Sequence, residues 1–237
     1  MSAQGQKVGV ITGGSQGIGA GLVEAYRKLG YAVVATSRSI APSDDPGVLT
    51  VQGDIGAPDT GRHVIEAAVE RFGRVDALVN NAGFYVGKPF TEFTEDDFTS
   101  LVAVNLGGFF RITQQAIPHM LAQGGGHIVQ ITTSNADHAI GTINGSLASL
   151  TKGGLQSVTK ALAIEYATRG IRFNAVAPGV MKTPMHAVET HEFLDALHPM
   201  GRMGEAGDIV DAVIYLENAP FVTGITLPVD GGQSAGH

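Results

Sequence analysis

Near its amino terminus the chain reads Val8-Gly-Val-Ile-Thr-Gly-Gly-Ser-Gln-Gly-Ile-Gly19. An apolar run of strand length leads through glycines into a segment of helical length. Gly13 permits the turn, Gly17 permits close approach of the main chain to a pyrophosphate, and Gly19 permits tight packing of the helix on the strand. The free N–H groups and the positive dipole end of such a helix favour phosphate. We therefore predict a dinucleotide-binding strand, turn and helix, with a purely structural glycine turn as the alternative.

Apolar, largely β-branched runs recur along the chain and alternate with amphipathic segments of helical length. Strands that are apolar on both faces and alternate with helices are typical of a parallel sheet covered on both sides. Right-handed crossovers make such a sheet doubly wound, so we predict an α/β fold of Rossmann type, with residues 1–237 as a single domain. The predicted strands are Val8–Thr12, Ala32–Thr36, Val48–Gln52, Val75–Asn80, His127–Thr132, Ile171–Ala177 and Ile225–Val229. The predicted helices span residues 17–29, 59–72, 95–122, 149–168 and 205–218.

Two less regular segments, 134–147 and 180–204, are long enough to be functional loops, and we expect them to cover the substrate. The second contains His186, His191 and His198, whose spacing gives no i, i+4 pair of the kind that binds zinc on a helix. We therefore predict no metal site and expect these histidines to lie at the surface or to line the pocket. His186 follows Thr183 closely and is a candidate for substrate contact.

The composition restricts the function further. Of the 237 residues, 43% are hydrophobic and none is cysteine, which excludes disulfides, thiolate metal sites and a cysteine nucleophile. A formal net charge of −7 argues against a nucleic-acid partner, because a binding face would need a basic stripe. No apolar stretch reaches the length of a membrane span, and no signal-peptide pattern is present. We expect a cytoplasmic enzyme that acts on a small molecule.

The glycine spacing and several later motifs resemble the short-chain dehydrogenase/reductase family, in particular its members similar to 3-oxoacyl-(acyl carrier protein) reductases. The resemblance extends over nearly the whole chain, and its segments come in the family's order. They are Asn80-Asn-Ala-Gly83, Val104-Asn-Leu-Gly-Gly-Phe109, Lys152, Asn174-Ala-Val-Ala-Pro-Gly179 followed by Thr183, and Val229-Asp-Gly-Gly232. The resemblance implies a nicotinamide dinucleotide as the cofactor.

The resemblance also implies particular cofactor contacts. It places Asp54 at the adenine, Lys152 at the ribose, and Val180 with Thr183 at the carboxamide. The full set of expected cofactor-binding residues is Gly13, Ser15, Gln16, Gly17, Ile18, Gly19, Ser37, Arg38, Asp54, Ile55, Asn81, Ala82, Gly83, Lys152, Pro178, Gly179, Val180 and Thr183.

The form of the dinucleotide depends on the end of the second strand. A carboxylate there would accept a hydrogen bond from the ribose 2′-hydroxyl of NAD(H) and repel a 2′-phosphate. The chain instead has Thr36-Ser37-Arg38, and arginine pairs well with phosphate. We therefore favour NADP(H). NAD(H) remains the alternative, because Arg38 can also stack on adenine and because many NADP(H)-preferring relatives have a basic residue where this chain has Gln16.

The catalytic residues that the family implies are incomplete. The family has a proton-donating tyrosine four residues before its lysine, but Ala148 stands four residues before Lys152. Of the five tyrosines, only Tyr85 is expected near a pocket. The family's active-site asparagine corresponds to Asn105. Its hydroxyl partner corresponds to Ser134, which we favour, or to Thr133, while a purely structural role at the strand end is the alternative for both.

Three functions are compatible with this pattern. The first is an oxidoreductase whose proton passes through Lys152, Asn105, a water molecule or His138, because loss of one general acid typically costs about 10²–10⁴-fold in rate. The second is a nucleotide-binding regulatory or structural subunit without turnover. The third is a lyase or isomerase that uses the same pocket.

We also expect a homo-oligomer, a tetramer or a dimer. In the family that the chain resembles, the two helices predicted at 95–122 and 149–168 form subunit contacts, and closed symmetric assemblies are the rule. Small residues at positions of these helices that look exposed permit close approach of a second copy. They are Gly107, Gly108, Gly153, Gly154 and Ala161.

Overall fold

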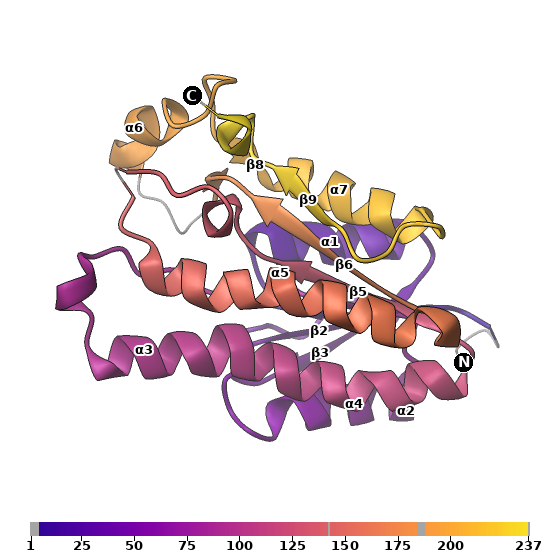
Figure 1. Cartoon of the computed structure of the whole chain (residues 1–237). Coiled ribbons are helices and arrows are strands. Elements are labelled where there is room, and N and C mark those ends of the chain that lie inside the picture. The colour runs from indigo at the N-terminus through magenta and orange to yellow at the C-terminus, as the bar shows by residue number, and fades with distance from the viewer. Residues whose placement is uncertain (1–4, 142, 184–187, 237) are drawn as a thin grey trace.

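The computed structural model describes residues 5–141, 143–183 and 188–236, and one seven-stranded sheet forms its centre. Neighbouring strands are parallel throughout, in the order β3-β2-β1-β4-β5-β6-β9 (Figure 1). The strand order reverses at β1, so the predicted doubly wound α/β fold is confirmed. The strands are β1 (Val8–Thr12), β2 (Ala32–Ser37), β3 (Val48–Gln52), β4 (Ala77–Asn80), β5 (Gly126–Ile131), β6 (Ile171–Pro178) and β9 (Thr226–Val229).

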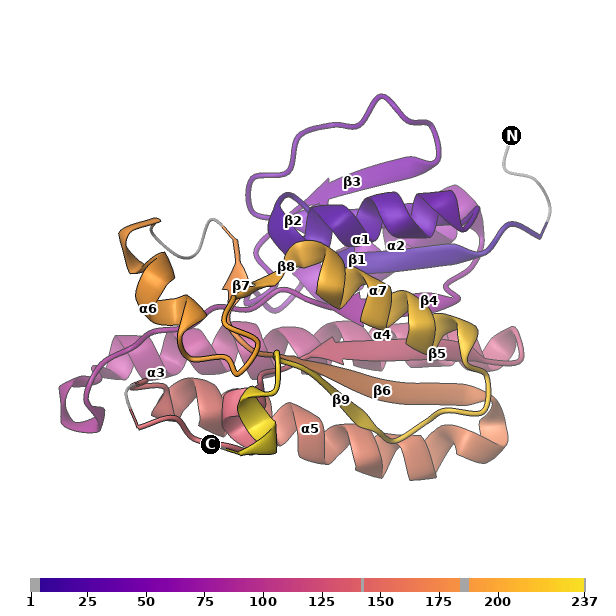
Figure 2. The same ribbon diagram turned by 90° about the horizontal axis from the view of Figure 1, so that it is seen from above.

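Helices cover both faces of the sheet and form two apolar cores. On one face, the core joins the strands to α2, α4 and α5 through residues such as Ile65, Ile112 and Phe173. On the other face, Leu22 of α1 and Ile209 of α7 pack over β1 and its neighbours, and Figure 2 shows these two helices side by side. The helices are α1 (Gly17–Lys28), α2 (Thr60–Phe72), α3 (Glu95–Leu101), α4 (Phe109–Ala122), α5 (Ser146–Tyr166), α6 (His191–Asp195) and α7 (Ala206–Asn218).

The helix predicted at 95–122 is interrupted. Its central part, Val102–Gly108, is a π-helix between α3 and α4. Insertions of this kind are frequent at functional sites, and this one contains Asn105. Gly108, which looked exposed in the sequence, is buried, and a Cβ there would lie only 3.0 Å from the side chain of Ile55. Its small size therefore serves packing within the chain.

The segment 180–204 contains structure that the sequence did not reveal. A short parallel pair, β7 (Met181–Lys182) and β8 (Gly204–Glu205), closes its base, and α6 lies between them in the chain. Figure 2 shows α6 beyond the carboxyl ends of the main strands. In the described ranges, no helix combines the length and apolar character needed to cross a membrane.

Candidate active site

A cavity of about 920 Å³ runs along the carboxyl ends of the strands. In an open parallel sheet this edge is where ligands bind, next to the point at which the strand order reverses. Every residue expected at the cofactor, including Gly13, Lys152 and Thr183, lines this cavity. The structure therefore brings the whole expected set together, although the contribution of each residue to binding stays a prediction.

The glycine-rich turn after β1 leaves room for a ligand. Gly13 and Gly17 have φ angles of +69° and +54°, which favour glycine, and a Cβ at Gly19 would collide with the carbonyl oxygen of Gly13. The residue that precedes α1, Gln16, makes no side-chain hydrogen bond to the helix end. The first N–H groups of α1 therefore face the cavity without a side-chain cap, as a diphosphate site requires.

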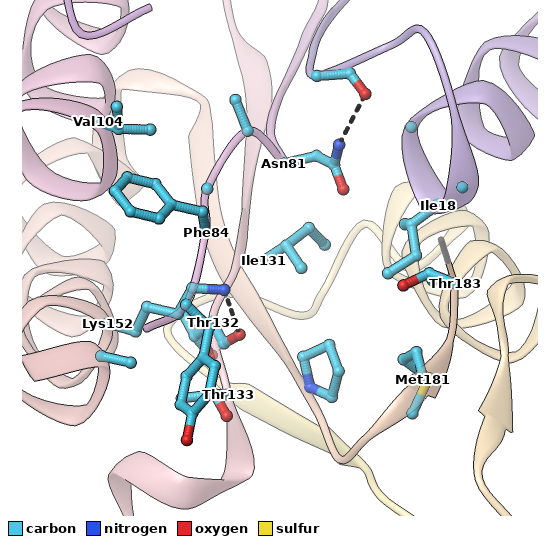
Figure 3. A pocket seen from close by; sticks show the side chains of 18 of the residues that line it. Ile18, Asn81, Phe84, Val104, Ile131, Thr132, Thr133, Lys152, Met181 and Thr183 are labelled. Atoms are coloured by element: carbon cyan, nitrogen blue, oxygen red, sulfur yellow. Dashed lines mark hydrogen bonds between the residues drawn. The ribbon is translucent and has the colours of Figure 1, made fainter. Parts of the chain in front are cut away.

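The end of β4 is fastened to the end of β1 behind this turn. The Nδ2 of Asn81 donates to the main-chain oxygen of Thr12 at 2.9 Å and to that of Gly13 at 3.3 Å. The Oγ1 of Thr12 accepts from the main-chain nitrogens of Asn81 and Ala82. Figure 3 shows the Asn81 side chain among the lining residues, with a hydrogen bond of its amide drawn as a dashed line. These bonds fix the wall on which the cofactor is expected to lie.

The end of the cavity near β2 and β3 contains the residues expected at the adenosine. Arg38 is exposed and forms no ion pair with a described residue, while Asp54 accepts a hydrogen bond from the main-chain nitrogen of Gly56 at 2.8 Å. The Oγ1 of Thr36 is buried and has no hydrogen-bond partner among the described residues. Polar groups and a cation with free bonding capacity are therefore available to a ribose and its substituents.

Lys152 occupies the other wall. Its Nζ donates to the main-chain oxygen of Thr132 at 3.2 Å (Figure 3), and burial lowers the pKa of the Lys152 ammonium group to about 8. Ala148 lies one helical turn earlier on α5 and also lines the cavity. Because alanine ends at Cβ, position 148 contributes no proton donor. The charged end of Lys152 is one ionisable group of the cavity lining. The phenol of Tyr85 is another, as expected from the sequence; it donates to the main-chain oxygen of Asn144 at 3.1 Å, and burial raises its pKa.

Asn105, which the resemblance implies as the active-site asparagine, lies behind the wall of the cavity. Its Oδ1 accepts from the main-chain nitrogen of Phe84, and its Nδ2 donates to the main-chain oxygen of Phe84 and to the Oγ1 of Thr151 at 3.1 Å. The side chain is buried and does not line the cavity. It joins the loop after β4 to α5, so a direct role of this amide in proton transfer does not fit the geometry.

The structure places the two candidate hydroxyls, Ser134 and Thr133, on different sides of the turn after β5. Ser134 is buried outside the cavity, where its hydroxyl donates to the Oε1 of Gln233 at 2.9 Å. Thr133 lines the cavity on the same side as Lys152 (Figure 3). The 3-10 turn that follows β5 directs the earlier residue inward and the later one toward the carboxyl-terminal segment. His138 is exposed and also lies outside the cavity.

The segment 180–204 supplies the wall that faces Lys152. Figure 3 shows Met181 and Thr183 on this side, near Ile18, and Phe193 and Leu194 of α6 complete it. Sequence analysis missed these two residues, because a five-residue helix leaves no readable periodicity. His186, the expected substrate contact, lies outside the described residues.

His198 contradicts the expectation of a surface or pocket position. It is buried, its Nε2 accepts from the main-chain nitrogen of Val180 at 3.0 Å, and its Nδ1 lies 3.0 Å from the carbonyl oxygen of Leu194. The imidazole therefore joins the cofactor-facing turn after β6 to α6. Among the described residues, no three His, Asp or Glu side chains are arranged to hold a metal ion.

This sheet and glycine turn define an α/β protein of the dinucleotide-binding type. Comparison with known proteins gives the family. A family model described as enoyl-(acyl carrier protein) reductase matches residues 13–234, and the chain is 33% identical to the L-fucose dehydrogenase of Bos taurus over 98% of this chain and 90% of that protein. The chain belongs to the short-chain dehydrogenase/reductase family.

Solved structures agree with this assignment. The structure of ElxO with NADP bound superposes with a TM-score of 0.90 at 30% identity, over 98% of this chain and 100% of that one. The 3-ketoacyl-(acyl carrier protein) reductase of Brucella melitensis, solved in complex with NADH, superposes with a TM-score of 0.89 at 33% identity, over 96% and 98% of the two chains.

Proposed function

We propose that this protein binds a nicotinamide dinucleotide along the cavity and interconverts the carbonyl and alcohol forms of a small molecule. The observation that carries the proposal is the convergence of an uncapped helix end, a glycine turn and a buried lysine on one cavity of about 920 Å³. The solved relatives that contain NADP and NADH, and the relatives named as dehydrogenases and reductases, support it. The bound coenzyme would supply hydride transfer.

NADP(H) is the proposed form. Arg38 lines the cavity at the end of β2, is exposed, and has no ion-pair partner among the described residues. Its guanidinium is therefore available to a 2′-phosphate, which it can bind through two parallel hydrogen bonds. Both NADP and NADH occur in the solved relatives, so the preference rests on Arg38.

Lys152 is the proposed source of the proton. With a pKa of about 8, its ammonium group is protonated at neutral pH and is a stronger acid than an ordinary lysine, as general acid catalysis requires. Thr133 is the proposed hydroxyl that polarises the substrate carbonyl. Thr132 and Thr133 both line the cavity after β5, but the Thr132 hydroxyl already donates to the main-chain oxygen of Val176 at 3.1 Å, whereas the Thr133 hydroxyl donates to no described residue. Lys152 would then release its proton to the substrate oxygen directly or through one water molecule.

A second candidate is a subunit that binds the coenzyme without turnover. The specific observation in its favour is Ala148, because the family's proton-donating tyrosine would stand at that position of α5. A lyase or isomerase that uses the same cavity is a third candidate. Both of these leave the binding part of the proposal intact.

The test is to measure NADPH binding and then NADPH oxidation with a broad set of carbonyl compounds, in the natural protein and in Lys152→Met. Methionine keeps the apolar stem and removes the ammonium group. Oxidation that depends on the carbonyl compound and falls at least about 100-fold in Lys152→Met supports the proposal. Binding without oxidation by any carbonyl compound would replace it with the second candidate.

A further inference from the structure

Two polar side chains share the wall beside Ala148. Thr133 and Asn135 both line the cavity just after β5. The main-chain nitrogen of Asn135 donates to the Oγ1 of Thr133 at 3.4 Å, and the main-chain oxygen of Asn135 accepts from the hydroxyl of Ser149 at 3.1 Å. Since Ser149 follows Ala148 directly, these bonds hold the pair against the first turn of α5.

The side chain of Asn135 has unused bonding capacity. Its Oδ1 is buried and has no hydrogen-bond partner, and its Nδ2 bonds to none of the described residues. Buried amide groups in folded proteins are nearly always paired, so an unpaired one at a cavity wall requires an explanation. The torsion that turns an asparagine amide is soft, so a small rotation presents either polar atom to a ligand. The hydroxyl of Thr133 accepts one hydrogen bond and donates none to a described residue, so it can donate a hydrogen bond to a ligand.

The rest of the substrate end is apolar or uncharged. Ile143, Phe193 and Leu194 line it, and Lys152 is the one charged side chain that the described residues contribute there. The other charged residues that line the cavity, Arg38 and Asp54, follow β2 and β3, on the far side of β1 and β4 from Thr133 in the strand order. A carboxylate or phosphate on the substrate would therefore find no second cation among the residues that the structure describes, whereas a hydroxyl group would find Asn135.

We infer that Thr133 and Asn135 together form a substrate subsite, and that the substrate is an uncharged α-hydroxy ketone or the corresponding vicinal diol. Thr133 would bind the reacting oxygen and Asn135 the oxygen on the neighbouring carbon. The two side chains lie two positions apart on one tight turn, so the groups that they bind must themselves be close neighbours. The inference rests on the proposed function, because it assigns a substrate to that same cavity.

The reaction is balanced without a further reactant. The ketone carbon gains a hydrogen with two electrons from the reduced coenzyme, and the oxygen gains the proton that Lys152 releases. The products are the diol and the oxidised coenzyme, and Lys152 regains its proton from solvent. The hydroxyl group at Asn135 undergoes no change and serves only to position the ketone.

The experiment compares 3-hydroxy-2-butanone with 2-butanone, which differ by one hydroxyl group. We expect the natural protein to reduce the hydroxy ketone with a kcat/KM at least about tenfold higher, since a site that hydrogen-bonds a substrate hydroxyl discriminates strongly against an analogue that lacks it. Asn135→Leu, which keeps a similar volume without polar atoms, should remove this preference, so that the two ketones are reduced with equal kcat/KM. Asn218→Leu at the end of α7, far along the chain from the cavity lining, is the matched control.

A second readout does not depend on turnover. Calorimetry measures binding of 2,3-butanediol to the protein saturated with oxidised coenzyme, in the natural protein and in both variants. Diol binding that is lost in Asn135→Leu and kept in Asn218→Leu supports the subsite, even if no ketone is reduced. Equal kcat/KM for the two ketones, or diol binding unaffected by Asn135→Leu, would overturn the subsite. Absence of NADPH oxidation with every carbonyl compound would overturn the proposed redox function instead.

Discussion

The Nζ of Lys152 lies 3.2 Å from the main-chain oxygen of Thr132, to which it donates a hydrogen bond. This bond ties α5 to the end of β5. It lies in the part of the cavity where the proposed reaction takes place. It satisfies one of the three N–H groups of the ammonium and leaves the others for ligands. The lysine is thus held in place by the main chain while its charge remains weakly compensated, and burial lowers its pKa accordingly.

The pH dependence of carbonyl reduction should report this lysine. Because the pKa of Lys152 is about 8, the acid form predominates below that pH and is lost above it. We expect kcat/KM for reduction to be constant toward neutral pH and to fall by about tenfold per pH unit above about 8, while alcohol oxidation shows the opposite trend. Steady-state rates across this range provide the measurement, and a reduction rate that stays constant well above pH 8 would contradict the assignment.

A phenol at position 148 should increase activity. Ala148→Tyr places a hydroxyl beside the ammonium of Lys152, and a neighbouring cation lowers the pKa of a phenol. We expect carbonyl reduction to rise by about 10-fold or more, part of the 10²–10⁴ that a general acid contributes. Ala148→Phe is the matched control, since it adds the same ring without the hydroxyl. Equal activity of the two variants would show that the remaining groups cannot use a phenol.

Arg38 should determine the choice of coenzyme. Removal of the guanidinium in Arg38→Ala is expected to weaken NADPH binding by about tenfold, because a hydrogen bond to a charged group contributes about 1.5–3 kcal/mol when buried and less when exposed. NADH lacks the 2′-phosphate and serves as the internal control. Fluorescence titration measures both dissociation constants, and a parallel loss for NADH would indicate stacking on adenine instead.

His198 should stabilise the fold. In His198→Asn the amide can still reach Leu194, but the main-chain N–H of Val180 loses its buried acceptor. An unpaired buried group costs about 1–3 kcal/mol, and each kcal/mol lowers Tm by about 2–4 °C in a chain of this size. Thermal unfolding is the measurement. His138→Asn, at an exposed position, should leave Tm unchanged, and equal Tm values for both variants would argue against the anchor.

Exposed apolar and small residues on the outer surface of α5 indicate that two or more copies of the chain associate. Leu150, Gly154, Ala161 and Ile164 form an exposed stripe along this helix, and Ile164 is 82% exposed. Apolar and small residues at this spacing suit a symmetric contact between copies. Light scattering should give at least twice the mass of one chain, and Ile164→Lys should reduce it. The matched substitution Leu29→Lys, at the end of α1, should not. A single-chain mass for the natural protein would refute the assembly.

The fold was largely readable because the central strands are short runs that are apolar on both faces. Val10 and Ile11, for example, are both fully buried although they point to opposite faces of β1. Such a pattern arises only in a sheet covered on both sides. The part of the cavity lining expected at the cofactor was equally readable, since the carboxyl ends of parallel strands meet at one edge and the motif segments follow those ends.

The features that could not be predicted from the sequence depend on local turns or on contacts between distant residues, and neither leaves a periodic pattern in the sequence. Which of Ser134 and Thr133 faces the cavity is determined by one 3-10 turn, because this turn directs adjacent side chains to opposite sides. The π-helix around Asn105 follows no composition rule that distinguishes it from an α-helix. His198 is buried because Gly179 and Gly231 leave space for its ring, a contact between residues distant in the chain.

Isothermal calorimetry of the purified protein with NADPH, NADP, NADH and NAD most directly tests whether the amino end of α1 binds a dinucleotide. We expect saturable binding of one coenzyme per chain, tightest for NADPH, and loss of that binding in Gly19→Val, whose side chain has no room beside Gly13. Absence of binding heat with all four coenzymes would contradict the account.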